Sequence, residues 1–136
     1  FKNGEFIKGP GMLEIGRMLL RTETGKINTL DQIASIAGIE KNAGTSLTEL
    51  KNTEKGRQLL QEATEALALT IANSALLFDV STILLCGKFL TAEQEIWEEL
   101  KEELLKFLPK DTRIFRYDEK RAAAGAAWIA AERRIK

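Results

Sequence analysis

Apolar residues recur three and four positions apart through the middle of the chain. From Thr53 to about Phe78 this spacing predicts the longest helix. Positions 66–72 are almost all apolar or small, so we expect this helix to be buried on more than one side. A second helix, amphipathic and opened by a capping-box pattern at Thr91, is predicted to run to Leu108, just before a proline.

Two strands are predicted around this second helix. Val80–Cys86 is a continuous apolar run rich in β-branched residues, which suits a parallel strand buried on both faces and ended by Gly87. At its end Cys86 is expected to pack as a small buried apolar group. Arg113–Tyr117 alternates like a strand, and an alanine-rich helix is predicted over about Glu119–Arg134. This order indicates an α/β layered domain with parallel strands.

The first third of the chain is more broken. Asn3-Gly4 is a strong signal for a β-hairpin. A short helix is expected to begin after Asn28 or Thr29 and to end at Gly38. Ser46 opens a capping-box pattern that predicts a further helix of one or two turns. The polar segment before the first of these helices shows no clear period.

Composition and charge exclude several classes of protein. The 136 residues suit one domain, and 44% of them are apolar, enough for a core. Twenty basic and twenty acidic residues balance, which argues against a general nucleic-acid clamp or a polybasic membrane patch. No apolar run is long enough to span a bilayer, and no signal peptide is evident.

The absence of histidine limits the chemistry further. With no His and a single Cys, this chain cannot form a Ser-His or Cys-His catalytic pair or a Cys/His zinc site. One thiol also makes no internal disulfide, so we expect a cytoplasmic protein. Carboxylate-bound Mg²⁺ remains open. Because the chain begins at Phe1 rather than Met, we expect it to be part of a longer protein.

Three short constellations could carry chemistry, and each has a plain structural alternative. Glu14 follows a glycine-rich turn, which could equally be a turn with a surface acid. Gly87 and Lys88 follow a strand, where ligands bind in open α/β sheets, although a glycine can simply end a strand. Gly125 lies in a run of alanines, which suits close packing as well as ligand approach.

Taken in order, these pieces resemble the ROK family of bacterial sugar kinases and sugar-responsive repressors, which has the actin-like ATPase (ribonuclease H-like) fold. The matching segments are a hairpin and glycine turn, a Glu-x-Gly-His-like motif, the end of a zinc loop with its helix, a strand ending near glycine, and a closing helix: Lys2–Gly11, Glu14–Arg17, Thr29–Ser35, Ile83–Lys88 and Ala123–Ala127. The resemblance covers nearly the whole chain but only the C-terminal half of a family member. It implies a single domain made of a hairpin and glycine turn, a degenerate zinc-loop region and an α/β core: 1–18, 19–52 and 53–136.

The departures from the family pattern change its chemistry. Arg17 stands in the place of the motif histidine and Thr29 in that of a zinc-binding cysteine, so no zinc is expected. Asp31 keeps the charge of the family's later sugar-binding Glu on a shorter stem. Arg17 could form a structural salt bridge with Glu14 or Asp31, or bind an acidic sugar or phosphate. Cys86 replaces a glycine, which predicts weakened or lost nucleotide binding.

The resemblance therefore implies two groups of site residues. Glu14, Arg17 and Asp31 are the expected sugar-binding residues. The expected nucleotide-binding residues are Gly87, Lys88 and Gly125. No catalytic residue and no metal ligand is expected within this chain.

Three functions follow as hypotheses. The first is the ligand-sensing domain of a ROK-type transcriptional regulator that lacks kinase activity and binds DNA only through an upstream domain. The second is the C-terminal half of an ATP-dependent sugar kinase of glucokinase or fructokinase type, with ATP and Mg²⁺ bound by the full-length protein. The third is a structural or oligomerisation domain. A small sugar or sugar phosphate is the expected partner, no membrane is involved, and apolar surface left open by half a cleft predicts a homo-oligomer.

Overall fold

The computed structural model describes residues 14–22, 24–92 and 94–117. Its elements in chain order are η1 (Ile15–Arg17), β1 (Leu19–Arg21), β2 (Ile27–Thr29), α1 (Leu30–Ala34), α2 (Ile36–Ala43), α3 (Leu47–Leu50), α4 (Glu54–Phe78), β3 (Thr82–Cys86), α5 (Lys88–Ala92), α6 (Gln94–Phe107) and β4 (Arg113–Tyr117). The predicted hairpin at Asn3-Gly4 and the predicted helix over 119–134 lie outside the described residues.

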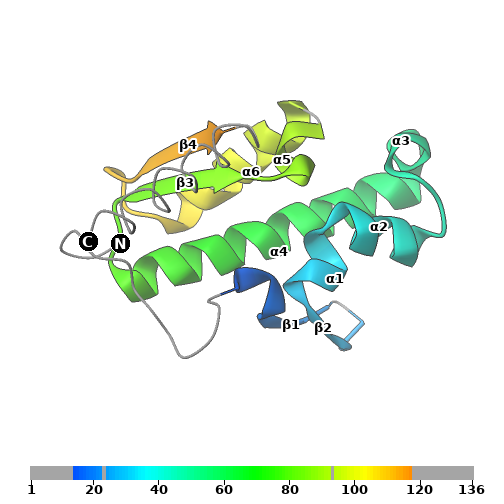
Figure 1. Ribbon diagram of the computed structural model, residues 1–136, viewed down its shortest axis with the longest axis horizontal. Coiled ribbons are helices and arrows are strands. Elements are labelled where there is room, and N and C mark those ends of the chain that lie inside the picture. The colour runs from blue at the N-terminus through cyan, green and yellow to red at the C-terminus, as the bar shows by residue number, and fades with distance from the viewer. Residues whose placement is uncertain (1–13, 23, 93, 118–136) are drawn as a thin grey trace, which may run out of the picture.

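The long helix α4 lies between two groups of elements (Figure 1). One group contains α5, α6 and the strands β3 and β4, with α6 packed along α4. The other contains η1, the β1–β2 hairpin, α1 and α2, with α1 packed on α4. Ala63 and Ala68 of α4 are fully buried, and such small side chains let the neighbouring helices come close. The prediction of a helix buried on more than one side is confirmed.

Two polar side chains of α4 lie in this core without loss of hydrogen bonding. Thr64 and Thr70 are each 1% exposed. Their Oγ1 atoms donate to the carbonyl oxygens of Leu60 (2.9 Å) and Ala66 (2.8 Å) on the preceding turn. Burial of the two hydroxyls therefore leaves neither unpaired.

The strands β3 and β4 pair in parallel, with Leu84 beside Phe115 and Cys86 beside Tyr117. The predicted α/β class and the parallel order are thus confirmed, and β4 has the predicted bounds. Burial of β3 on both faces was wrong. Ile83 faces the core at 8% exposed, whereas Leu84 is 62% exposed. An apolar run alone does not say how many faces are covered, because exposed apolar side chains are common on protein surfaces.

The short helices of the first third follow their caps. Thr29 caps α1 in a reciprocal capping box with Gln32. This confirms the predicted start of the first short helix. The predicted end at Gly38 was wrong, because Ser35 interrupts the helix with an extended backbone and its Oγ accepts from the Gly38 amide at 3.0 Å. Gly38 instead lies inside α2, where a Cβ would come within 2.4 Å of the Asp31 carbonyl oxygen. Its small size permits the close contact between α1 and α2.

The segment before α1, which shows no period, forms the antiparallel hairpin of β1 and β2. Gly25 lies in its turn with φ +80, a conformation that favours glycine. Leu19 and Ile27 are 71% and 57% exposed, so the two short strands bury little. Without a buried face, the sequence has no alternation by which to recognise a strand.

Candidate functional site

Asp31 and Gly16 bring the first predicted site together. Gly16 is the middle residue of η1, and Asp31 lies in the first turn of α1. A Cβ built on Gly16 would lie 2.3 Å from Oδ1 of Asp31 and 2.6 Å from its Cγ. The Asp31 carboxylate therefore occupies space that is free only because residue 16 has no side chain. Gly16 of the motif Glu14–Arg17 is thus in contact with Asp31.

Glu14 and Arg17 flank this contact from either end of η1. Glu14 precedes the 3₁₀ turn and makes no capping hydrogen bond through its side chain. Both side chains are exposed. Within the described part of the chain, Arg17 forms no ion pair with Glu14 or Asp31. The structural salt bridge that could have explained Arg17 is therefore not formed.

The second predicted site is the turn from β3 into α5. Gly87 has φ +148, which side-chain-bearing residues rarely adopt, and a Cβ there would meet no atom of the described residues within 4 Å. Glycine is thus required by the backbone. Lys88 is the first residue of α5 and is exposed. Cys86 is exposed too, so its expected burial was wrong. It is paired with Tyr117 of β4.

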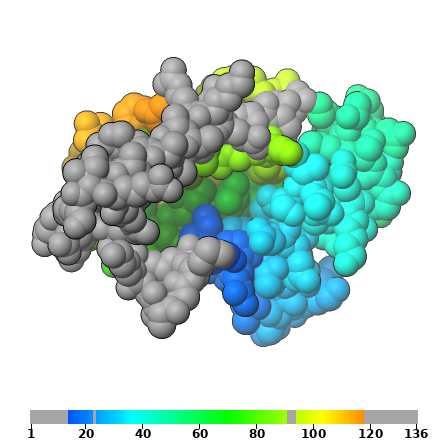
Figure 2. Space-filling model, viewed as in Figure 1, coloured from blue at the N-terminus to red at the C-terminus, as the bar shows by residue number. Residues whose placement is uncertain are grey.

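A cleft of about 560 Å³ joins the two predicted sites. One wall carries Asp31 with Ile15, and the opposite wall carries Cys86, Gly87 and Lys88. In Figure 2 the green surface of α4 lies recessed between the blue and cyan elements on one side and the yellow-green β3–α5 segment on the other. Its lining comes from η1, α1, α2, α4, β3 and α5: Ile15, Asp31, Ala34, Ser35, Ile36, Ala37, Glu40, Leu67, Ile71, Leu85, Cys86, Gly87, Lys88, Phe89 and Leu90. Glu14 and Arg17 stand beside the cleft rather than in its lining. Gly125 lies outside the described residues.

The sequence gives no indication of two further polar residues in the lining. Ser35 donates through Oγ to the Asp31 carbonyl oxygen at 2.6 Å, which fixes the backbone beneath the carboxylate. Glu40 accepts through Oε1 from the Leu47 amide at 2.9 Å, so it holds the start of α3. Both are placed by the break between α1 and α2, and a break at Ser35 is the signal that would have found them.

Comparison with known proteins decides the family. The sequence model of the ROK family matches residues 1–133, almost the whole chain. The chain belongs to the ROK family. Curated proteins contain no match to it. The family-level prediction made from the motifs is confirmed.

Two solved structures share the fold, one of a ROK hexokinase and one of a candidate sugar kinase. The ROK hexokinase from Thermus thermophilus is 21% identical, with a TM-score of 0.63 over 76% of this chain and 41% of that chain. A candidate sugar kinase from Cytophaga hutchinsonii ATCC 33406 is 20% identical, with a TM-score of 0.60 over 82% of this chain and 45% of that one. The chain spans less than half the length of either protein. These likenesses show the actin-like ATPase fold, as predicted.

The zinc site of the ROK family does not fit this chain. By the resemblance described above, Arg17 and Thr29 stand where the family has an imidazole and a thiolate donor to zinc. A guanidinium cannot ligate a cation, and the chain has no histidine with which to replace it. Among residues 14–22, 24–92 and 94–117, no group of three or more Asp, Glu, Cys or His could hold a metal ion.

A second groove, of about 470 Å³, lies away from the predicted ROK site residues, between the α3–α4 junction and α6. Its lining is rich in glutamate and includes Lys51 and Arg57 near the start of α4. Glu103 in this lining accepts a hydrogen bond from Lys106, which raises the pKa of Lys106.

None of the described helices is long and apolar enough to cross a membrane. Among the features described, the cleft is the one that brings Asp31 together with Gly87 and Lys88.

Proposed function

We propose that the cleft between η1–α1 and β3–α5 binds a sugar or a sugar phosphate. The observation that carries this proposal is the juxtaposition of Asp31 with Gly87 and Lys88 around one cavity of about 560 Å³. That volume suits a small ligand. A carboxylate accepts hydrogen bonds from sugar hydroxyl groups, and hydrogen bonds to a charged acceptor are stronger than those to a neutral one. In the lining, Asp31 takes this role, whereas the Glu40 carboxylate already accepts from the Leu47 amide. Glu14 adds a further carboxylate beside the cleft.

The opposite wall supplies positive charge. Lys88 is a cation whose ammonium can pair with a phosphate, and Arg17 is a second cation beside the cleft. Leu67 and Ile71 of α4 form the apolar floor of the cleft. This floor suits the apolar face of a sugar ring, which is formed by C–H groups. The polar and apolar parts of the lining thus match an amphipathic ligand with a charged end.

For the whole protein we propose a ligand-sensing role in a ROK-type transcriptional regulator without kinase activity. The support is the set of departures from the kinase motifs: Arg17 for histidine, Thr29 for cysteine and Cys86 for glycine. Cys86 adds a side chain next to Gly87 on the path that a nucleotide would take. DNA would be bound by a domain upstream of this one, because the chain itself carries no excess of positive charge. The protein would act as a homo-oligomer.

The second candidate is the C-terminal half of an ATP-dependent sugar kinase. The names of both structural relatives favour it, since one is a hexokinase and the other a candidate sugar kinase. In this case Gly87 and Lys88, together with Gly125, would flank the adenosine. ATP with Mg²⁺ would supply the phosphoryl group, and the base would come from the other half of the cleft.

Calorimetric titration of the full-length protein with D-glucose, D-fructose and their 6-phosphates tests sugar binding. We expect saturable heat with at least one of the four, and at least about tenfold weaker binding after Asp31→Ala. No heat with any of them, or equal binding by the variant, would contradict the proposal. Sugar-dependent formation of ADP from ATP would decide for the kinase over the regulator.

A further inference from the structure

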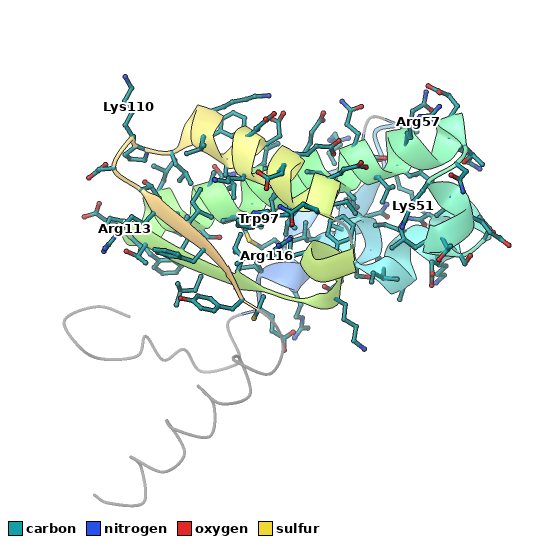
Figure 3. The ribbon with its side chains drawn as sticks, turned by 90° about the horizontal axis from the view of Figure 1, so that it is seen from above. Lys51, Arg57, Trp97, Lys110, Arg113 and Arg116 are labelled. Atoms are coloured by element: carbon teal, nitrogen blue, oxygen red, sulfur yellow. The ribbon has the colours of Figure 1, made fainter. Side chains whose placement is uncertain are left out.

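Arg116 connects the strand β4 to the helices α5 and α6. It is half-buried and lies beside Leu85 in the parallel pairing of β3 with β4. Its Nη1 donates to the carbonyl oxygen of Leu90 at 3.2 Å, and its Nη2 donates to Oε1 of Gln94 at 2.8 Å. Its guanidinium carbon lies 5.3 Å from the centre of the Trp97 ring. Figure 3 shows the Arg116 and Trp97 side chains next to each other.

The bond to Leu90 has a physical reason. α5 has five residues, and the last carbonyl groups of any helix lack partners within it. Arg116 supplies a donor to one of these carbonyls and places a cation at the negative end of the helix. The bond is made to the backbone, so it fixes the position of α5 itself and not only of a side chain.

The hydrogen bond to Gln94 and the cation–π contact with Trp97 connect Arg116 to α6. Trp97 is 8% exposed, and Leu100, one turn further along α6, is fully buried against the core. α6 is therefore held firmly by α4, and Arg116 links α5 to it. A guanidinium can reach both acceptors at once because its donors form a rigid fork, whereas a lysine ammonium is a single point.

We propose that Arg116 is a positioning residue that holds the cleft wall formed by Gly87–Leu90. α5 begins directly after Gly87, and all four residues of that wall line the cleft. Arg116 is not in the lining, so it acts on the wall and not on a ligand. Its effect on ligand affinity rests on the proposed function; its effect on the wall does not.

The test is hydrogen–deuterium exchange of the full-length protein, read peptide by peptide, on Arg116→Gln, Arg116→Lys and a control. The control is Arg113→Gln, because Arg113 lies on the same strand and donates to Thr82 at 3.1 Å, far from the cleft. We expect Arg116→Gln to raise exchange of the peptide that contains α5 at least about tenfold while α4 peptides stay unchanged. Arg116→Lys should behave like Arg116→Gln, and Arg113→Gln like the unaltered protein.

Three results would overturn the proposal. They are unchanged exchange of the peptide that contains α5 in Arg116→Gln, an equal rise in α4 peptides that marks general destabilisation, and full rescue by Arg116→Lys. Titration of the unaltered protein with D-glucose and D-glucose 6-phosphate separates this test from that of the proposed function. If either sugar binds, Arg116→Gln should raise its dissociation constant. If neither binds, sugar binding fails, and the exchange result still decides the role of Arg116.

Discussion

The position of the Asp31 carboxylate depends on the absence of a side chain at Gly16. The Asp31 carboxylate occupies the space that a Cβ at Gly16 would need, 2.3 Å from Oδ1. Gly16 lies in a 3₁₀ turn rather than in a conformation reserved for glycine, so its role is steric. The identity of one residue thus decides where the carboxylate of another lies, although fifteen positions separate them.

Gly16→Ala should therefore impair the site more than the fold. The Asp31 side chain can rotate away, so we expect a loss of stability of no more than about 1 kcal/mol. Sugar binding should weaken at least about tenfold, because a charged hydrogen bond is misplaced. Calorimetry for binding and thermal unfolding for stability measure the two effects.

An Asp31→Ala background provides the control for this prediction. There, Gly16→Ala should cause no further loss of binding, because the carboxylate that it displaces is already absent. An equal additional loss in that background would show that Gly16 acts through something other than Asp31.

At the scale of elements, the caps decide where helices begin, and two similar patterns behave differently. Thr29 and Gln32 form both hydrogen bonds of a capping box at the start of α1. Ser46 precedes α3 with the same pattern, yet its side chain makes no capping bond. Glu40 accepts from the Leu47 amide in its place. A residue outside the local pattern has taken over the function of the cap.

This difference gives a matched pair of substitutions. Thr29→Ala should lower the free energy of unfolding by about 1 kcal/mol, because a helix amide loses its acceptor. Ser46→Ala should change it by less than about 0.5 kcal/mol, as at an ordinary exposed site. Chemical denaturation measures both. Equal losses for the two variants would contradict the assignment of the caps.

Elements with one strong local cause could be predicted, and those set by tertiary contacts could not. The helical spacing of α4, the amphipathic pattern of α6 and the alternation of β4 each predicted the element that is present. The predicted start of α6 at Thr91 was wrong, because Thr91 lies within the separate helix α5. The break at Ser35, the exposed outer face of β3 and the exposure of Cys86 depend on what packs nearby. Asp31, Gly87 and Lys88 came from a resemblance to the ROK family. Arg116 has no local signal, because its partners lie 22 and 26 positions away.

At the scale of the molecule, α4 separates two groups of elements and forms the floor between them. Leu67 and Ile71 of α4 lie at the bottom of the cleft, while Asp31 and Lys88 lie on opposite walls. The two walls come from segments more than fifty positions apart in the sequence. The central claim is that this space holds the ligand, with both walls in contact with it.

Protection of Cys86 tests that claim most directly. Cys86 is exposed, is the single cysteine of this chain and lines the wall opposite Asp31. Its alkylation by iodoacetamide can be followed by mass spectrometry of the peptide that contains it, with and without a saturating sugar that calorimetry shows to bind. We predict alkylation at least about threefold slower with the sugar present, and protection of Asp31→Ala only at sugar concentrations at least about tenfold higher. An unchanged alkylation rate with the sugar fully bound would place the ligand elsewhere and contradict the account.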